Sequence, residues 1–495
     1  MYNFPTLPAL KRLAIFAHRW TGAAFCLLFA WWFISGIFMM YFDYPEVTER
    51  DRLAHAGPID VSEVKLSPEQ AWAQLKTPGA PDEVIVETYD GRAAYWFRIG
   101  GRQKIVYADN GQVQQEKVTA ARNLRTAARW ARQSIGEARI ETPTAEDQWT
   151  VGGLYRNYAP LTKYSWPNGD EVYISGVRGE VVQFTTRLSR AGAWLGPIPH
   201  WLYFTPLRRN GRLWSRIVIG LSGAATVVAL LGLIAGLSMY SPAKRYRSGG
   251  VPTSIPYAGP KRLHMILGLF FGFLACTWAF SGMLSMDPFP SPTTDDSGAS
   301  SAIVGALNGE PFAFERFAAK HPREALGSLK IKQLEFLVVA GEPVYLATQD
   351  ANHSVLIPVR GEVRTQFDVP RLIEIVTKAS QPPGLAETRL ITEYDAYYLD
   401  RHHELPLPVL RVRFKGRPQT TLYIDPHNAR VVGGYNSAMW AERWLYHGFH
   451  SINLPWLYNH RPAWDLAVLA LMLGGTTLSI TSVMIGFRLI SRLGR

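Results

Sequence analysis

The stretch that decides the fold is His18-Arg-Trp-Thr-Gly22, which opens a long apolar run. The run continues through Phe25, Trp32, Ser35 and Gly36. The same pattern returns 246 residues later, where His264-Met-Ile-Leu-Gly268 opens a second run with these matching residues: Phe271, Trp278, Ser281 and Gly282. Six matched residues at one offset are not expected by chance. They predict an internal repeat.

The repeat continues beyond these apolar runs. Asp147 and Asp395 match at an offset of 248, and further matches have an offset of 250. The latter are Tyr95 with Tyr345, Gly111 with Gly361, Trp194 with Trp444, His200 with His450, and Trp214 with Trp464. We therefore predict two copies of one unit in parallel topology. Parallel membrane repeats are related by a twofold pseudo-axis along the membrane normal.

Four apolar runs are long enough to cross a bilayer as helices. The first, Trp20 to Phe42, would span roughly 35 Å at 1.5 Å per residue, against ~30 Å of hydrocarbon. Its length favours a retained span over a signal peptide. The other three run from about Leu213 to Tyr240, Leu263 to Met286 and Trp464 to Leu489.

Positive charges predict the orientation of these spans. Basic residues without acids fill the short link between the second and third spans, and others flank the outer ends of the first and fourth. The link contains Lys244, Arg245, Arg247, Lys261 and Arg262. Lys11, Arg12 and Arg19 flank the first span, and Arg488, Arg492 and Arg495 flank the fourth. A smaller group opposes them at the other end of the second span: Arg208, Arg209, Arg212 and Arg216. The majority predicts an inner-membrane protein with both termini in the cytoplasm.

The predicted fold class is therefore an α+β membrane protein with two large periplasmic α/β domains. The first half has a first span with a cytoplasmic N-terminus (1–42), a first domain (43–195), and an interfacial segment with the second span (196–240). A cytoplasmic loop (241–262) leads to the second half. That half has the third span (263–286), a second domain (287–445), and an interfacial segment with the fourth span and a cytoplasmic C-terminus (446–495).

Local signals predict several elements in these domains. Ser67-Pro-Glu-Gln70 is typical of a capped helix start, with Ser67 as the cap and Gln70 reaching back. Further helices are expected at Thr119–Ile135 and Val369–Ala379, and strands at Tyr95–Ile99 and Lys104–Ala108. Asp109-Asn110-Gly111 is a turn signal.

The repeated histidines are the main candidate site. His18, Gly22, Phe25, Trp32 and Gly36 share one face of a helix. An imidazole in or near lipid is costly without a partner, and the symmetry would place His18 and His264 at one depth on either side of the axis. Two neutral imidazoles facing each other suit the axial positions of a haem, with the glycine leaving room for the macrocycle. The alternative is a packing face with hydrogen-bonded histidines.

His200 and His450 form a second matched pair near the opposite ends of the second and fourth spans. They could hold a second haem, on the periplasmic side. The alternative is an interfacial belt in which histidine lies at headgroup level. His447 has no counterpart, because Pro197 stands at the matching position, and it is another possible ligand.

The sequence gives less support to a disulfide scaffold, to other metal sites and to nucleic-acid binding. The two cysteines, Cys26 and Cys276, both lie in apolar runs, which excludes a disulfide scaffold and a cysteine-based metal site. The net charge of +12 fits basic membrane flanks, and no nucleic-acid-binding motif is present. His402 and His403 are adjacent, and their side chains would point apart on an extended segment. They would therefore chelate a metal poorly, and we expect them to be surface residues.

These features resemble the PepSY-associated transmembrane family of bacterial inner-membrane proteins. The resemblance covers nearly the whole chain and rests on the order of its motifs. They are His18-Arg-Trp-Thr-Gly22, Tyr107-Ala-Asp-Asn-Gly-Gln-Val113, Trp201-Leu-Tyr-Phe-Thr-Pro206, His264-Met-Ile-Leu-Gly268, Asp395-Ala-Tyr-Tyr398, Tyr423-Ile-Asp-Pro426 and Trp444-Leu-Tyr-His-Gly-Phe-His-Ser451. The resemblance implies PepSY-like periplasmic domains, b-type haem and, as in some members, reduction of ferric siderophores. It implies haem ligands among His18, His264, His200, His450 and His447.

The predicted function is a ferric-reductase-type oxidoreductase, a dihaem electron carrier in the lipid bilayer. It would pass electrons from an unidentified donor to a periplasmic ferric complex or other acceptor. Candidate substrate contacts lie near the repeated aspartates: Asp147, Trp149, Tyr155, Tyr158, Asp395, Tyr397 and Tyr398. The alternative is a non-redox periplasmic binding or sensing protein, in which the membrane histidines only pack.

Overall fold

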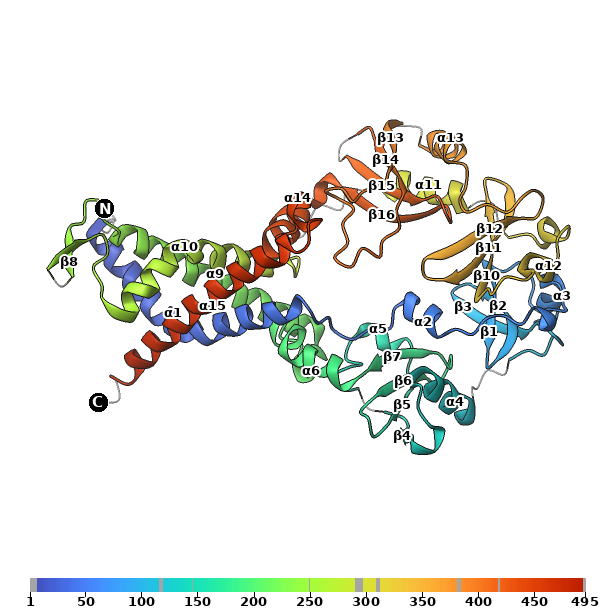
Figure 1. Ribbon diagram of the computed structural model, residues 1–495, viewed down its shortest axis with the longest axis horizontal. Coiled ribbons are helices and arrows are strands. Elements are labelled where there is room, and N and C mark those ends of the chain that lie inside the picture. Colours follow the sequence, from blue (N-terminus) through green and yellow to red (C-terminus); the bar gives the residue numbers. More distant parts are fainter. Residues whose placement is uncertain are drawn as a thin grey trace, which may run out of the picture.

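The protein is a mixed α/β structure in which a helix bundle adjoins a group of β-sheets (Figure 1). The computed structural model describes residues 7–114, 119–144, 146–248, 250–289, 297–308, 312–380, 384–416 and 419–492. Arg495, one of the basic residues used to predict orientation, lies outside these ranges. Among the described residues, four helices are long and apolar enough to cross a membrane: α1 (Leu7–Met39), α9 (Gly211–Met239), α10 (Gly259–Leu284) and α15 (Ala463–Ile490).

Three of these helices lie within a few residues of the predicted spans, whereas α1 begins 13 residues before Trp20. The added segment contains good helix formers such as Leu10, Lys11 and Arg12, and Pro8 falls in the first turn, where proline is tolerated. The apolar run locates the part that fits a bilayer, while the helix itself continues past it. His18 therefore lies inside α1 and has helical turns on both sides.

The four helices form a bundle in which α1 and α10 each pack against both α9 and α15. Glycines allow the close approach. A Cβ at Gly474 would overlap the ring of Phe271, and one at Gly475 would overlap the ring of Phe33. The start of α1 and the end of α15 lie at one end of the bundle, here called the terminal end, and the sheets adjoin the other, here called the sheet end (Figure 1).

Three larger sheets lie beyond the sheet end, and a short hairpin lies at the terminal end (Figure 1). The first four-stranded sheet contains β4 (Arg139–Glu141), β5 (Leu161–Ser165), β6 (Glu171–Ser175) and β7 (Val181–Thr185). The second contains β13 (Leu385–Ile391), β14 (Val409–Phe414), β15 (Thr420–Asp425) and β16 (Arg430–Asn436). The hairpin pairs β8 (Tyr246–Ser248) with β9 (Val251–Thr253).

The third sheet combines strands from both halves of the chain. Its order is β12-β11-β10-β1-β2-β3, with bounds β12 (His353–Pro358), β11 (Glu342–Asp350), β10 (Gln333–Val339), β1 (Glu83–Tyr89), β2 (Arg92–Ile99) and β3 (Arg102–Tyr107). At its centre β1 and β10 pair antiparallel, with Ile85 opposite Glu335. The two long loops, treated as separate segments in the sequence, thus share one sheet.

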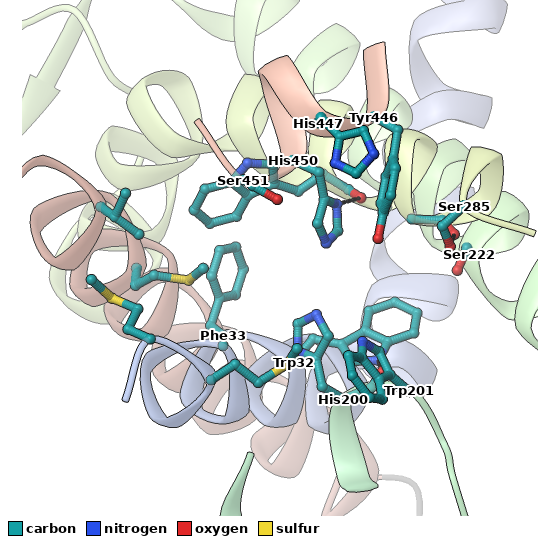
Figure 2. A pocket seen from close by; sticks show the side chains of 18 of the residues that line it. Trp32, Phe33, His200, Trp201, Ser222, Ser285, Tyr446, His447, His450 and Ser451 are labelled. Atoms are coloured by element: carbon teal, nitrogen blue, oxygen red, sulfur yellow. Dashed lines mark hydrogen bonds between the residues drawn. The ribbon is translucent and has the colours of Figure 1, made fainter. Parts of the chain in front are cut away.

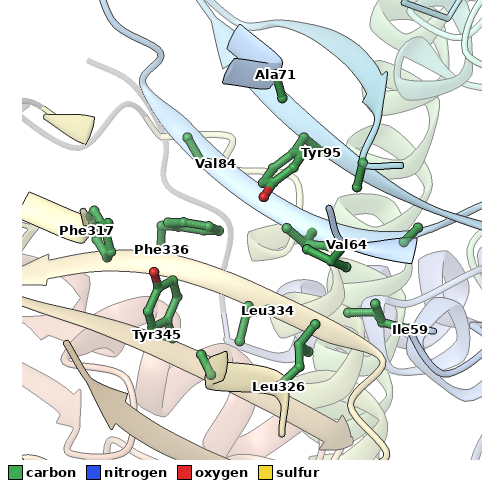
Figure 3. Packing of buried hydrophobic residues seen from close by; sticks show 14 of the residues in the cluster. Ile59, Val64, Ala71, Val84, Tyr95, Phe317, Leu326, Leu334, Phe336 and Tyr345 are labelled. Carbon is green, nitrogen blue, oxygen red and sulfur yellow. The ribbon is translucent and has the colours of Figure 1, made fainter. Parts of the chain in front are cut away.

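The core beside this joint sheet also draws on both halves (Figure 3). Tyr95 and Tyr345 are both fully buried, and each hydroxyl donates a hydrogen bond to a backbone carbonyl, Leu66 for Tyr95 and Lys320 for Tyr345. Phe336 packs against both tyrosine rings. Buried aromatic contacts therefore strengthen the connection made by the strand pairing.

The local predictions in the loops are largely confirmed. Ser67 caps α3 (Pro68–Ala73) in a capping box with Gln70. The predicted helix at 119–135 is α4 (Ala120–Ala131), which ends where Arg132 adopts a left-handed conformation. The predicted helix at 369–379 is α13 (Val369–Ala379), and the predicted strands fall in β2 and β3. The predicted turn is present, with Gly111 at φ +75°.

Short helices fill the connections. Those of the first half are α2 (Glu49–His55), η1 (Val61–Glu63), η2 (Ile135–Glu137), α5 (Gly153–Arg156), α6 (Arg187–Leu195), α7 (Pro197–His200) and α8 (Thr205–Arg208). Those of the second are α11 (Ser297–Asn308), η3 (Phe314–Phe317), α12 (Pro322–Leu326), η4 (Ser437–Met439), the π-helix η5 (Glu442–Gly448) and α14 (Pro455–Tyr458). α7 and η5 matter most, because they lead the chain back to the bundle beside His200 and His450.

Candidate functional site

The structure brings the four repeated histidines together as two facing pairs. The imidazole of His18 on α1 faces that of His264 on α10, with ring centroids 6.3 Å apart and ring planes 26° apart. His200, at the end of α7, faces His450, which follows η5, with centroids 6.0 Å apart and planes 75° apart. The first pair is here called the terminal-end pair and the second the sheet-end pair.

In the terminal-end pair, each Nδ1 atom bonds to a neighbouring helix. Nδ1 of His18 lies 3.0 Å from the carbonyl oxygen of Val228 on α9. Because a carbonyl only accepts, this Nδ1 carries the proton. Nδ1 of His264 lies 3.1 Å from the hydroxyl of Thr481 on α15, which itself donates to the carbonyl of Leu478. That hydroxyl is therefore free to accept from Nδ1.

In the sheet-end pair, serines on the long helices play the same part. Nδ1 of His200 lies 3.0 Å from the hydroxyl of Ser35, which donates to the carbonyl of Trp32. Nδ1 of His450 lies 2.9 Å from the hydroxyl of Ser281, which donates to the carbonyl of Trp278. Both hydroxyls are thus oriented to accept from Nδ1.

One conclusion follows for all four rings. When Nδ1 carries the proton, Nε2 of a neutral imidazole keeps its lone pair and can bind a metal ion. Hydrogen-bonded Nδ1 atoms of this kind fix the tautomer and ring orientation of metal-bound histidines in other proteins. Figure 2 shows ring nitrogens of His200 and His450 directed toward each other across the space between them.

Tryptophans fix the backbone that carries the sheet-end pair. The indole nitrogen of Trp32 donates to the carbonyl of His200 at 3.1 Å, and that of Trp278 donates to the carbonyl of Phe449 at 2.7 Å. Each long helix therefore holds both the ring and the main chain of the segment that returns to it. Trp32 and Trp278 belong to the matched motifs of α1 and α10, so these motifs help to position His200 and His450.

Glycines make room beside the rings. A Cβ at Gly36 would lie 3.6 Å from Cε1 of His200, and one at Gly282 would lie 3.5 Å from Cε1 of His450. At the other pair, a Cβ at Gly22 would lie 3.7 Å from Cε1 of His18, whereas one at Gly232 on α9 would come within 2.6 Å of it. Gly232 is thus the tightest of these contacts.

A cavity of about 280 Å³ surrounds the sheet-end pair (Figure 2). That volume lies near the lower end of the range for ligand pockets, ~300–1,000 Å³. Aromatic and sulfur-containing side chains form much of its wall, including Trp32, Phe33, Trp278, Met40 and Met472. Burial lowers the pKa of His200 to about 3 and that of His450 to about 4, so both rings are neutral at pH 7.

His447 lines the same cavity, from η5. Its ring lies against Tyr446, with centroids 4.7 Å apart, and Tyr446 lies against His450. The facing partner of His200 is His450. The structure thus places His447 beside the sheet-end pair, outside its facing geometry.

The predicted substrate residues lie in two corresponding connections, one between β4 and β5 and the other between β13 and β14. Asp147 accepts from the hydroxyl of Tyr173 at 2.6 Å, and Asp395 accepts from the hydroxyl of Tyr423 at 2.7 Å. Asp395 also forms an ion pair with Arg411. The other candidates contact nearby residues. Three make ring contacts: Trp149 with Tyr44, Tyr397 with Tyr435, and Tyr398 with Tyr423. The hydroxyl of Tyr155 accepts from the amide of Gln183, and the guanidinium of Arg178 lies over the ring of Tyr158. Substrate contact by these residues stays a prediction.

His402 and His403 lie apart from both pairs, on the surface. His402 contacts the exposed carboxylate of Asp43, and the ring of His403 packs against Tyr394.

Sequence reasoning identified the four histidines but missed most of their partners. Ser35 and Ser281 belonged to the matched motif, so their repetition was a usable signal. Val228 contributes only a carbonyl, and Thr481 and Gly232 belong to no quoted motif, so nothing in the sequence marked them. No protein-family model matches the chain, and no curated protein matches it either.

Proposed function

We propose that this protein is a b-type dihaem electron carrier of the bacterial inner membrane, with each histidine pair ligating one haem. The observation that carries the proposal is the separation of the paired rings. Two imidazoles on opposite sides of one iron have ring centroids about 6.2 Å apart, because each iron–nitrogen bond is ~2.0 Å and each centroid lies about 1.1 Å beyond its nitrogen. The two pairs have 6.3 Å and 6.0 Å.

The donor set also fits haem. All four Nδ1 atoms have acceptors, so Nε2 of each ring would be available to hold haem iron. Haem supplies a one-electron couple when bound. The residues of this chain would ligate it, exclude water from it and, through the Nδ1 acceptors, tune the basicity of its ligands.

The spacing of the two pairs along the bundle supports a path across the bilayer. His200 lies beside Gly36, which is 18 residues from His18 on the same helix. At 1.5 Å per residue, the pairs are about 27 Å apart along α1, most of the ~30 Å hydrocarbon thickness. Between them Phe33 of α1 contacts Trp278 of α10, with ring centroids 5.7 Å apart.

We further propose that the chain is a parallel repeat about one twofold pseudo-axis. Three contacts support it, since each joins a residue to its own counterpart. They are His18 with His264, His200 with His450, and Ile85 opposite Glu335 in the joint sheet. A residue can meet its counterpart only near the axis that relates them. In this proposal the domains are PepSY-like.

The orientation is part of the proposal. The terminal end, with its basic residues, would lie in the cytoplasm, and the sheets in the periplasm. Electrons would enter from an unidentified donor and leave at the sheet-end pair. The acceptor would be a periplasmic ferric complex such as a ferric siderophore. Reduction would release the iron, because hard oxygen ligands hold Fe(II) less well than Fe(III).

Haem stoichiometry tests the proposal. Full-length protein, expressed with ample haem precursor and purified in detergent, should contain two haems per chain and show a Soret band with sharp reduced α-bands. His18→Ala and His450→Ala should each retain one haem, while the surface variant His402→Ala should retain two. A wild-type protein without a Soret band would refute the proposal and favour the non-redox binding or sensing role.

A further inference from the structure

Arginine side chains lie along one side of the cavity at the sheet-end pair, and haem ligation by the histidines does not require them. Arg401, Asn453 and Tyr458, all from the second half of the chain, line it together with the apolar residues. Arg443 lies directly behind, since its guanidinium donates to the carbonyl of Asn453 at 3.1 Å. Two arginines therefore adjoin one part of the cavity wall.

The charge of Arg401 is held in place but weakly compensated. One terminal nitrogen donates to the carbonyl of Met39, at the end of α1, at 2.9 Å. The other lies 3.1 Å from Asp43, whose side chain is 61% exposed and also contacts His402. A solvated ion pair of this kind contributes little, typically below about 1 kcal/mol. Arg401 can therefore bind a second anion at low cost.

Arg443 is buried more deeply, with 9% of its surface exposed. Its hydrogen bonds go to the carbonyls of Ala396 and Asn453, and its guanidinium lies over the ring of Trp444. Nη1 is buried without a hydrogen-bond partner, and within the described ranges no carboxylate forms an ion pair with this side chain. A buried cation is costly unless anions compensate its charge. Asp395 acts on Arg443 from a distance, without an ion pair, so an anion in the adjoining cavity would add to this compensation.

The fold itself does not require an arginine here. Trp194 matches Trp444, so Ala193 stands where the second half has Arg443. Ala193 is fully buried, and a small apolar side chain satisfies that position in the first half. The charge is thus an addition specific to one half of the chain and to one side of the cavity.

We propose that Arg401 and Arg443 form a carboxylate-binding subsite on the second-half side of this cavity. Guanidinium groups match the planar geometry of a carboxylate and bind it with charge-assisted hydrogen bonds. This subsite rests on the proposed function, because that function supplies the two possible sources of the carboxylate. One is the propionate of the haem at the sheet-end pair, and the other is an anionic ferric complex that approaches it.

The first arm of the test measures haem release. Purified full-length protein is loaded with haem b or with its dimethyl ester, and transfer to apomyoglobin is followed optically. If propionate is the ligand, Arg401→Gln speeds the release of one of the two haems at least tenfold, and Arg443→Gln does the same. With the ester, wild type and variants should release haem at equal rates. Arg209→Gln, an exposed arginine at the same end of the bundle, is the control.

The second arm measures binding of citrate and ferric citrate to the haem-loaded protein by calorimetry. If an external carboxylate is the ligand, wild type binds these probes, Arg401→Gln weakens binding at least tenfold, and haem release is unchanged. Arg443→Lys retains the charge and should rescue a variant that folds poorly as Arg443→Gln. Unchanged haem release and unchanged probe binding in all arginine variants would overturn the subsite. If wild type holds no haem, the proposed function fails, and the citrate arm alone decides the subsite.

Discussion

The hydroxyl of Ser281 accepts from Nδ1 of His450 at 2.9 Å while donating to the carbonyl of Trp278, and so connects the imidazole to the backbone of α10. Ser35 does the same for His200 on α1. One hydroxyl thus fixes both the tautomer and the direction of each ring. Such outer partners are worth roughly 10–100-fold in metal affinity in other proteins.

Ser281→Ala should therefore weaken haem binding at the sheet-end pair about 10-fold, because His450 would lose its nearer acceptor and keep the carbonyl of Trp278, 3.2 Å from Nδ1. Haem titration of the apo-protein, followed at the Soret band, measures the effect. Ser238→Ala removes a hydroxyl that bonds only to its own helix, at Ala235, and serves as control. Equal affinities in wild type and Ser281→Ala would show that the hydroxyl has no such role.

Gly232→Ala should remove one haem selectively. Its Cβ would lie 2.6 Å from Cε1 of His18, so the ring must shift from the position in which it pairs with His264. Gly220 lies on the same helix with open space at its Cβ position, and Gly220→Ala should retain both haems. The haem count of the two purified variants tests the prediction, which fails if Gly232→Ala keeps two.

His447→Ala should retain two haems, unlike His450→Ala. The facing geometry belongs to His200 and His450, while His447 packs beside Tyr446. Because His447 lines the cavity, its removal should shift the midpoint potential of one haem without removing it. Pyridine haemochromogen counts and an optical redox titration give the two readouts. Loss of a haem in His447→Ala would make it a ligand.

Glu87, opposite Gln333 at the β1–β10 junction, should make stability depend on pH. Burial raises its pKa to about 7, above the ordinary value of 4.5. The folded state therefore keeps a proton that the unfolded state loses, and stability should fall as pH rises from about 4.5 to about 7.

Glu87→Gln should remove this contribution and stabilise the protein at pH 8 by about 3 kcal/mol, since the two pKa values differ by about 2.5 and each pKa unit corresponds to about 1.4 kcal/mol. Thermal unfolding of the full-length protein in detergent at pH 5 and pH 8 tests it. Glu362→Gln changes an exposed carboxylate and is the control. If both variants respond to pH as wild type does, Glu87 does not titrate as described.

The sequence predicts those parts of the structure that depend on local or repeated patterns. Apolar length located the helices, and the Ser67 capping box located α3. The matched motifs predicted the pairing of His18 with His264 and of His200 with His450, and the structure places both pairs face to face.

Other features depend on contacts that no local pattern encodes. The pairing of Ile85 with Glu335 joins strands far apart in the chain, and either strand could have remained an edge. The acceptor for His18 is the carbonyl of Val228, which every residue type could supply. Arg401 belongs to none of the matched motifs, so the comparison that identified the histidines could not identify it.

The β1–β10 pairing has a consequence for how such a chain could arise. A polypeptide of half the length would carry β1 with one unpaired edge and a single imidazole at each level of the bundle. It could complete both only by associating with a second, identical molecule, so its cofactor affinity would depend on protein concentration. In the proposed repeat, joining the two copies in one gene would remove that dependence and would let each copy change separately, as at Ala193 and Arg443.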